Sequence, residues 1–265
     1  MRLLTWNINS VRLRIGLVAQ ICEEYQPDIV CLQETKTPDE FFPHEKFEEL
    51  GYSYRHIAGM KGYNGVCVLA KQPFENPQIY PRCGQDDCRH ISVQFPEFEI
   101  HNLYIPSGGS GGDEPDPFNN PKFLHKLDFV DEMTDWFGKN YSADTPMIAV
   151  GDFNIAPYEH DVWSHKQLLK VISHTPDETE RLEKMRQSLE WIDTRTYFVD
   201  MDKKCYTWWS YRNRDWKKSN RGRRLDHIWV TKPLEPHLSG HNILTHARDF
   251  EKPSDHVPVI LDLKF

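Results

Sequence analysis

Short clusters of polar residues lie where the apolar runs of this sequence begin or end, and their residue types can bind cations and transfer protons. Side chains from several strand ends can converge on one edge of a sheet, which is how metal and phosphate sites are usually built. The clusters are Asn7-Ile8-Asn9, Gln33-Glu34-Thr35, Gly151-Asp152-Phe153-Asn154, Asp226-His227 and Ser254-Asp255-His256. The adjoining apolar runs are short and bounded by turn signals, so they predict buried strands.

The oxygen atoms in these clusters favour a site for a hard cation. Glu34, Asp255 and an Asn amide offer the oxygen ligands that Mg²⁺ prefers. The 13 histidines are spread along the chain, so a zinc site is poorly supported. In two pairs, both side chains leave the same face of an extended chain: Asn7 with Asn9, and Asp152 with Asn154.

His256 is the candidate for acid–base chemistry, because the unperturbed pKa of an imidazole lies near neutrality. A carboxylate bonded to the ring would fix its tautomer and raise its basicity. Asp255 is adjacent in sequence, and Asp226 begins a neighbouring predicted strand, so both are candidates for that partner. A histidine that only packs in the core is the alternative.

Amphipathic helices are predicted at three places between the apolar runs. Apolar residues at helical spacing indicate the first two: Leu17, Val18, Ile21, Cys22 and Tyr25, then Phe123, Leu127, Val130, Met133 and Phe137. The segment Thr175-Pro176-Asp177-Glu178 has the pattern of a capping box with Pro at the first helical position. The helix that it opens is expected to bury Leu182, Met185, Leu189 and Ile192.

Many short extended runs, such as residues 65–70 and 99–104, separate these helices. They outnumber the strands of one simple doubly wound sheet, so we expect sheets packed together with helices outside. Neither a repeat nor a linker divides the chain, which predicts a single domain over residues 1–265. Residues 106–118, rich in Gly and Pro, predict a mobile surface loop.

The charge of the chain is unevenly distributed. A net charge of −8 over 265 residues argues against indiscriminate binding to polyanions. Residues 212–224 (RNRDWKKSNRGRR), which we call the basic segment, hold seven Arg or Lys residues against Asp215. Their local charge of +6 leaves −14 for the remainder of the chain. A basic segment on an acidic body predicts a directed phosphate contact; a solvated surface loop is the alternative.

The cysteines and the lengths of the apolar runs favour a cytoplasmic protein. No run approaches the roughly 18 residues that a membrane span needs, and the first residues become polar too soon for a signal peptide. The six cysteines have no zinc-type spacing, and four adjoin apolar runs, as buried reduced thiols do. A disulfide between Cys83 and Cys88 is a minority alternative.

Five motifs together resemble those of the exonuclease III family of abasic-site DNA-repair nucleases, within the endonuclease/exonuclease/phosphatase superfamily. They are WNIN, LQET, GDFNIAP, RLDHIWV and SDHVPV, in the family's order from Trp6 to Val259. The resemblance implies a four-layer α/β sandwich of the DNase I-like type, with two packed mixed β-sheets flanked by helices and the site at one end. It also implies a Mg²⁺ cofactor, for which Mn²⁺ can substitute.

The resemblance implies roles for the polar clusters in metal binding. Glu34 resembles the family's principal Mg²⁺ ligand, and Asn7 and Asp255 resemble residues close to the metal. Asp152 and Asn154 belong to the same group of residues around the cation.

The resemblance also implies metal-assisted hydrolysis, in which water attacks phosphorus in line and the sugar 3′-oxygen leaves. Asp152 resembles the residue that orients or deprotonates the water. His256 resembles the imidazole that contacts a phosphate oxygen, and Asp226 the carboxylate that orients this ring. The groups expected to hold or orient the phosphate are Asn154, Tyr104 and Asn9.

Aromatic residues adjoin the basic segment and predict a contact with an unstacked nucleotide. Trp208 and Leu225 resemble the family's apolar pocket for a flipped-out abasic deoxyribose, whereas core packing is the favoured interpretation of Trp209. The side chains expected to contact the DNA backbone are Arg212, Arg214, Lys217, Lys218, Arg221, Arg223 and Arg224.

Two positions depart from the family's pattern. After Tyr104-Ile105-Pro106 the chain has Ser107 and a glycine-rich acidic loop, where relatives often have a larger amide side chain. Arg223 stands where some relatives have a bulky aromatic residue beside the pocket. The balance between abasic incision and 3′-exonuclease digestion is therefore open.

The leading hypothesis is a Mg²⁺-dependent DNA-repair nuclease that hydrolyses the phosphodiester 5′ to abasic sites in duplex DNA, with 3′–5′ exonuclease or 3′-end trimming activity. Its expected partner is duplex DNA with abasic sites or 3′-blocked ends, bound by a monomer away from membranes. One alternative is a superfamily phosphodiesterase acting on RNA or small phosphoesters, which the basic segment disfavours. The other is a catalytically silent RNA- or protein-binding regulator, which the complete set of polar clusters disfavours.

Overall fold

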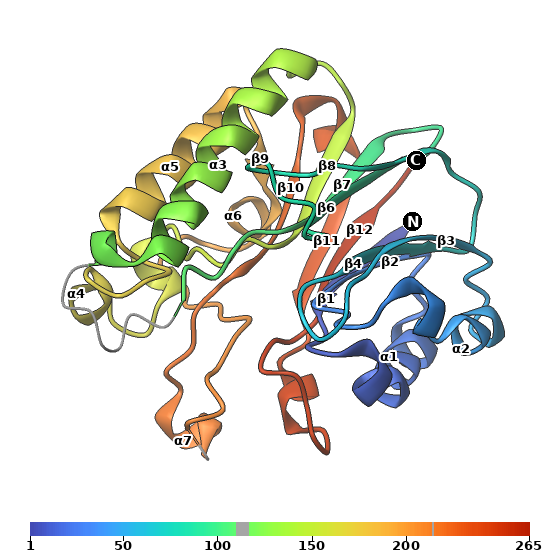
Figure 1. Ribbon diagram of the computed structural model, residues 1–265, viewed down its shortest axis with the longest axis horizontal. Helices are drawn as coiled ribbons and strands as arrows, with labels where there is room; N and C mark the ends of the chain where they lie inside the picture. The colour runs from blue at the N-terminus through green and yellow to red at the C-terminus, as the bar shows by residue number, and fades with distance from the viewer. Residues whose placement is uncertain (110–116, 214) are drawn as a thin grey trace.

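Two β-sheets of six strands each pack face to face in the computed structural model (Figure 1). The structure describes residues 1–109, 117–213 and 215–265. Arg214 and the middle of the predicted loop 106–118 therefore lie outside the described residues.

The first sheet joins strands from both ends of the chain, in the order β11-β12-β1-β2-β4-β3. Its strands are β1 (Arg2–Asn7), β2 (Ile29–Gln33), β3 (Tyr54–Ala58), β4 (Val66–Ala70), β11 (Leu238–Ile243) and β12 (Val259–Leu263). Strand β1 runs parallel to β2 and antiparallel to β12, with Arg2 opposite Asp262. The apolar runs that flank the polar clusters supply its buried central strands, as predicted.

The second sheet has the order β5-β6-β7-β8-β10-β9. Its strands are β5 (Glu75–Ile79), β6 (His90–Gln94), β7 (Glu99–Tyr104), β8 (Met147–Asp152), β9 (Ile192–Asp193) and β10 (Asp226–Val230). Near the end of β8, Gly151 has a φ of +136°, and a Cβ at this position would lie 2.0 Å from the carbonyl oxygen of Leu103. Only glycine fits here, so β7 and β8 approach closely just before Asp152.

Helices cover the outer faces of both sheets (Figure 1). On the first sheet lie α1 (Val11–Tyr25) and α2 (His44–Glu49), and on the second lie α3 (Pro121–Asn140) and α5 (Pro176–Ser188). The shorter helices are α4 (His165–Leu168), α6 (Thr194–Phe198) and α7 (Trp216–Ser219). One apolar core fills the space between the sheets, and two more lie under the helices. The predicted four-layer α/β sandwich is confirmed.

The predicted capping box forms at the start of α5. Thr175 Oγ1 accepts from the backbone N–H of Glu178, and Glu178 Oε2 accepts from the backbone N–H of Thr175 at 3.0 Å. Leu182 and Met185 are buried, as expected. The prediction for Ile192 was wrong, because α5 ends at Ser188 and Ile192 begins β9. The reason is a left-handed turn just after the helix, where Glu190 has a φ of +53°.

The remaining predictions about the chain concern disulfides and membrane spans. All six cysteines are free thiols, so Cys83 and Cys88 are not bridged. Within the described residues, no helix is both long and apolar enough to cross a membrane. Short 3₁₀ helices complete the described chain: η1 (Asp39–Phe41), η2 (Pro117–Asn119), η3 (Glu159–Asp161), η4 (Lys232–His237) and η5 (Thr245–Asp249).

Candidate active site

Strand register brings the polar clusters of both sheets to one end of the sandwich. In the second sheet, Tyr104 lies opposite Asp152, which lies opposite Asp226. In the first sheet, Asn7 ends β1 and Glu34 follows β2. The amide of Asn7 joins the two sheets, because its Nδ2 donates to Asp152 Oδ2 at 2.8 Å and to Glu34 Oε1 at 2.9 Å.

Asp152 is fully buried and held on both carboxylate oxygens. Its Oδ1 accepts from the backbone N–H of Asn154 at 2.9 Å, and its Oδ2 accepts from Nδ2 of the same residue at 3.1 Å. Burial raises the pKa of Asp152 to about 7, with His256 and Asn7 opposing the shift and Asp226 adding to it. A carboxyl that titrates near neutrality is suited to take a proton from water.

His256 lies between two carboxylates. Its Nδ1 is 2.8 Å from Asp226 Oδ2, and its Nε2 is 3.6 Å from Asp152 Oδ2. Burial alone would lower the pKa of His256, but Asp226 and Asp152 outweigh it and raise the pKa to about 10. The imidazole is therefore cationic at neutral pH, and its partner is Asp226 rather than the adjacent Asp255.

Glu34 lines the cavity, and both of its carboxylate oxygens have polar partners. Oε1 also accepts from the Tyr104 hydroxyl at 2.9 Å, and Oε2 lies 2.6 Å from Lys36 Nζ. Burial would raise the pKa of Glu34, yet Lys36 and Asn7 hold it below its ordinary value. Glu34 has a φ of +52°, a left-handed conformation that is uncommon for a glutamate and is found at functional sites.

Asp255 connects the metal-binding candidates to the aromatic wall of the site. Its Oδ1 accepts from Asn9 Nδ2 at 3.1 Å, and its Oδ2 accepts from Trp208 Nε1 at 3.0 Å. Burial would raise the pKa of Asp255, but His256, Asn9 and Trp208 together lower it, so the group is ionised at neutral pH.

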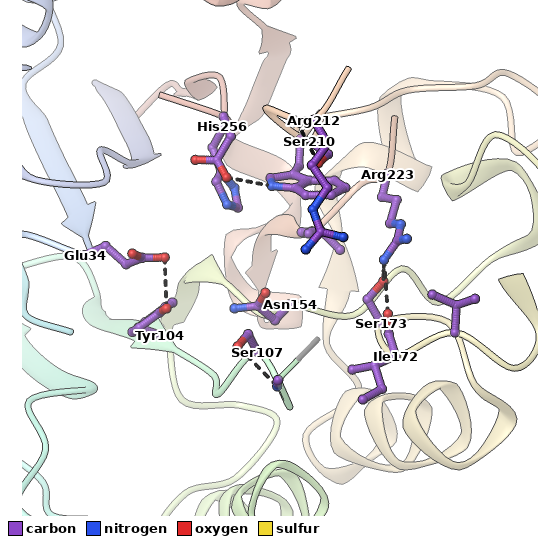
Figure 2. Close-up of a pocket in the computed structure, with 15 residues that line it drawn as sticks. Glu34, Tyr104, Ser107, Asn154, Ile172, Ser173, Ser210, Arg212, Arg223 and His256 are labelled. Atoms are coloured by element: carbon purple, nitrogen blue, oxygen red, sulfur yellow. Dashed lines mark hydrogen bonds between the residues drawn. The ribbon is translucent and has the colours of Figure 1, made fainter. Parts of the chain in front are cut away.

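A cavity of about 680 Å³ opens beside these groups (Figure 2). One end of the cavity is acidic, with Glu34 and Asp255, and its other lining includes the guanidinium groups of Arg212 and Arg223. The remaining lining residues are Tyr104, Ser107, Gly109, Asn154, Val171, Ile172, Ser173, Trp208, Ser210, Leu225 and His256. The cavity therefore has room for more than one sugar ring and offers charges of both signs.

The acidic end fits a hard divalent cation. Carboxylate and amide oxygens from Glu34, Asp255 and Asn9 gather there, which is the donor set that Mg²⁺ prefers. The Lys36 ammonium contacts both Glu34 Oε2 and Asn9 Oδ1, at 2.6 and 2.7 Å, so this position already holds a positive charge.

A second group of potential ligand atoms lies deeper in the site. One atom each of Asp152, Asp226 and His256 lie within 4.8 Å of one another. We favour the position at Glu34 for a cation, because Glu34 and Asp255 line the cavity, whereas Asp152 and Asp226 are buried behind it.

The basic segment lies on a loop that carries α7 at its tip, away from the two sheets (Figure 1). Lys217, Lys218 and Arg221 are exposed, and Lys217 pairs with Asp249 at 2.7 Å. Arg212 is also exposed and reaches into the cavity. These four side chains can meet a phosphate backbone, whereas Arg214 lies outside the described residues.

Arg224 does not belong to this exposed group, so its expected contact with DNA was wrong. Its side chain is 1 % exposed, with Nε 2.8 Å from Asp161 Oδ1 and Nη2 2.8 Å from Asp193 Oδ2. Burial would lower the pKa of Arg224, but the two carboxylates outweigh it and raise the pKa. Trp209 is likewise buried, as expected for a core residue.

The sequence interpretation missed two residues of the site. Lys36 contacts Glu34 and Asn9. It could have been predicted from the sequence, because it lies only two residues after Glu34. Lys126 is fully buried and donates to the backbone oxygen of Asn154 at 2.8 Å. The sequence did not indicate that Lys126 belongs to the site. A lysine beside the apolar face of a helix ordinarily extends its charged end into solvent, whereas Lys126 in α3 is buried.

Comparison with known proteins gives consistent results. Residues 4–256 match the Endonuclease/Exonuclease/phosphatase family. The chain is 31 % identical over 280 residues to exodeoxyribonuclease III of Haemophilus influenzae, and the match covers 100 % of both chains. It is 28 % identical to the DNA-(apurinic or apyrimidinic site) endonuclease of Dictyostelium discoideum, covering 99 % of this chain and 71 % of that protein. An AP endonuclease from Archaeoglobus fulgidus superposes with a TM-score of 0.91 at 26 % identity, over 100 % of each chain.

Proposed function

The chain belongs to the endonuclease/exonuclease/phosphatase family, and from this premise we propose that it is a Mg²⁺-dependent DNA-repair nuclease. Its proposed reactions are hydrolysis of the phosphodiester 5′ to abasic sites in duplex DNA and trimming of 3′ ends. The observation that carries the proposal is the buried Asp226–His256–Asp152 set beside Glu34, at the rim of a cavity lined by arginines.

Asp152 is proposed to orient the attacking water and accept its proton. The raised pKa of Asp152 supports this role, since such a carboxylate is a stronger base than an exposed aspartate. Asn154 and Tyr104 line the cavity and are proposed to hold the phosphate there. For this the Tyr104 hydroxyl would exchange its hydrogen bond to Glu34 for one to a phosphate oxygen. Asn9 helps to orient the phosphate at the acidic end.

His256 is proposed to stabilise charge that develops on the phosphate. Asp226 keeps the imidazole protonated and fixes its orientation through Nδ1, which leaves Nε2 directed toward Asp152 and the cavity. A preorganised donor of this kind contributes roughly 10²- to 10³-fold to the rate.

Glu34 and Asp255 would hold the Mg²⁺ ion, with Asn7, Asp152 and Asn154 adjacent, and Mn²⁺ is expected to substitute. Asn7 directs the Glu34 carboxylate by donating to its Oε1. The bound cation supplies a positive charge that stabilises the developing negative charge on the phosphate. Lys36 already holds Glu34, so it also fixes the direction of this carboxylate.

Duplex DNA is proposed to lie across the cavity and the basic segment. Arg212, Lys218 and Arg221 are exposed and can contact the backbone, and Lys217 can do so by giving up its ion pair with Asp249. Trp208 and Leu225 would form the wall for an unstacked residue. A cytoplasmic monomer is the state in which we expect the enzyme to act.

One assay tests the proposal against the two alternatives. A duplex with one abasic site and an intact duplex are each incubated with Mg²⁺ or with EDTA, using the wild type and Asp152→Asn. Metal-dependent incision of the abasic duplex by the wild type alone supports the nuclease. Cleavage restricted to RNA or small phosphoesters points to the related phosphodiesterases, and no cleavage of any substrate points to a silent binding protein.

A further inference from the structure

A fully buried ion pair between Lys126 and Glu178 joins α3 to α5 beside the cavity. The Lys126 ammonium has three protons, and three acceptor oxygens lie within hydrogen-bonding distance of it. The acceptors are Glu178 Oε1, the carbonyl oxygen of Asn154 at 2.8 Å and the carbonyl oxygen of Ser107 at 3.4 Å. Asn154 and Ser107 line the cavity (Figure 2), so this one charge is bonded to two segments of the cavity wall.

The Glu178 carboxylate is bonded to a third segment of the wall. The backbone N–H of Ser173, which also lines the cavity, lies 2.8 Å from each of the two carboxylate oxygens. Oε2 accepts in addition from the hydroxyl of Thr175 at 2.8 Å, within the capping box of α5. The ion pair therefore connects three parts of the cavity wall, which are distant in sequence, to two helices that cover the second sheet.

Stability alone does not account for this pair. Taking two charges out of water is costly, and replacing such a pair by apolar side chains often leaves stability unchanged or raises it. Asp131 and Arg181 also join α3 to α5, at a more exposed position, with Arg181 Nε 2.9 Å from Asp131 Oδ2. Lys126 differs from Arg181 in that its charge is bonded to residues that line the cavity. The placement of these residues therefore explains the buried pair better than helix packing does.

The bond from Lys126 to Asn154 reaches the reaction centre through a single residue. Asn154 has a φ of +54°, a left-handed conformation that is uncommon for residues other than glycine, although asparagine adopts it more readily than most. In this conformation its backbone N–H donates to Asp152 Oδ1, and its Nδ2 donates to Asp152 Oδ2. Rotation of the Asn154 backbone out of the left-handed region would break the bonds to both Asp152 and Lys126, so the buried pair opposes it.

We propose that Lys126 and Glu178 are positioning residues, which hold Asn154 in its left-handed conformation and thereby fix the carboxylate of Asp152. The inference rests on the proposed nuclease function, in which Asp152 orients the attacking water and accepts its proton. Lys126 and Glu178 are fully buried and lie outside the cavity lining, so DNA does not reach them. Loss of the pair should therefore lower the rate of the chemical step and leave the affinity for DNA nearly unchanged.

The test replaces the ion pair without leaving a charge unpaired. In the double variant Lys126→Met/Glu178→Gln, the glutamine carbonyl oxygen can take the place of Oε2 and keep the capping box with Thr175. Single-turnover incision of an abasic duplex should slow by roughly 10- to 100-fold, the range expected when a reacting group moves by about 1 Å. Affinity for the same duplex, measured in EDTA, and the midpoint of urea unfolding should both stay close to the wild-type values.

A second background separates positioning from a general effect on the fold. In Asp152→Asn the carboxylate that the pair positions is already gone, so adding the double substitution should cost less than about threefold in rate. Arg181→Met/Asp131→Asn is the matched control, because it removes the other ion pair between the same helices and should keep the wild-type rate. If the double variant does not fold, Lys126→Gln/Glu178→Gln, which replaces the ion pair by two amides, gives the same comparison.

A wild-type rate of incision in the folded double variant would overturn the inference alone. An equal loss of rate in the wild-type and Asp152→Asn backgrounds would do the same, since the pair would then act independently of that carboxylate. A loss of DNA affinity as large as the loss of rate would assign the pair to substrate binding and also refute it. Absence of Mg²⁺-dependent incision by the wild type itself would instead overturn the proposed function.

Discussion

The catalytic end of the sandwich and the basic segment are both rich in charge, yet they are built in opposite ways. Asp152, His256 and Asp226 are buried, project from strand ends and are held by hydrogen bonds from both sheets. Lys217 and Lys218 lie in the short helix α7 at the tip of a loop, and the Lys217 side chain is 65 % exposed. The difference indicates that hydrolysis needs fixed atoms, whereas contact with a polyanion needs only charge within reach.

Substitution of Arg224 tests whether this residue belongs to the buried, fixed part of the molecule although its sequence neighbours are exposed. Arg224→Met removes a guanidinium that neutralises two buried carboxylates, so the free energy of unfolding should fall by about 3–5 kcal/mol. Urea unfolding measures the change. Lys218→Met, six positions earlier in the basic segment, should change the unfolding free energy by less than about 0.5 kcal/mol. Equal effects of the two substitutions would remove the distinction.

Asp152→Asn tests the fixed geometry of the catalytic end. The substitution keeps the shape of the side chain and removes the proposed base, so single-turnover incision should slow by roughly 10²- to 10³-fold. Affinity for the abasic duplex, measured in EDTA, should change little. Asp144→Asn, at an exposed carboxylate, is the control and should keep the wild-type rate. Strongly weakened binding by Asp152→Asn would assign this residue to recognition instead.

The pH profile of incision should reflect the two buried titrating groups. Asp152 accepts a proton only when ionised, so kcat/KM should fall about tenfold per pH unit below its pKa, which burial raises to about 7. His256 stabilises charge only when protonated, so a second decline should begin as the pH approaches its pKa of about 10. His256→Gln should lose the alkaline limb, and an unaltered alkaline limb in that variant would assign it to another group.

Substitutions of exposed residues in the basic segment should have the smallest effects of those considered, and these effects should be on DNA affinity and its dependence on salt. Lys218→Gln and Arg221→Gln should each weaken DNA binding only a few-fold and reduce the slope of log affinity against log salt by about 1. Fluorescence anisotropy at several salt concentrations measures both. Lys139→Gln, at an exposed lysine on α3, should leave the slope unchanged. If the basic segment variants also keep the wild-type slope, this loop does not contact the backbone.

Short-range patterns predicted the strands and helices well, because each element has its own signature. The capping box at Thr175 and the apolar run at residues 147–150 lie in the elements that they predicted. Ile192 was wrongly assigned to α5. The left-handed backbone at Glu190 separates Ile192 from the helix, and helix propensities and apolar spacing do not predict such a residue.

Pairwise contacts between distant residues were harder to predict. Residue types in the motifs identified the candidate site, but the contact of Asn7 with Asp152 depends on how the two sheets pack. The same limit explains the wrong prediction for Arg224. Its neighbours in sequence are basic, but its partners Asp161 and Asp193 are far from it in sequence. The six described basic residues of this segment therefore divide between surface and core for reasons that only the tertiary structure contains.

The pairing of β1 with β12 has a consequence for biosynthesis. Arg2 lies opposite Asp262, and His256 reaches Asp152 from a segment just before β12, so the site needs both ends of the described chain. A nascent polypeptide still lacking residue 256 on the ribosome would have no assembled reaction centre. Long-range closure of this kind is slow compared with local helix formation. We therefore expect nuclease activity to appear during translation only after β12 has docked against β1.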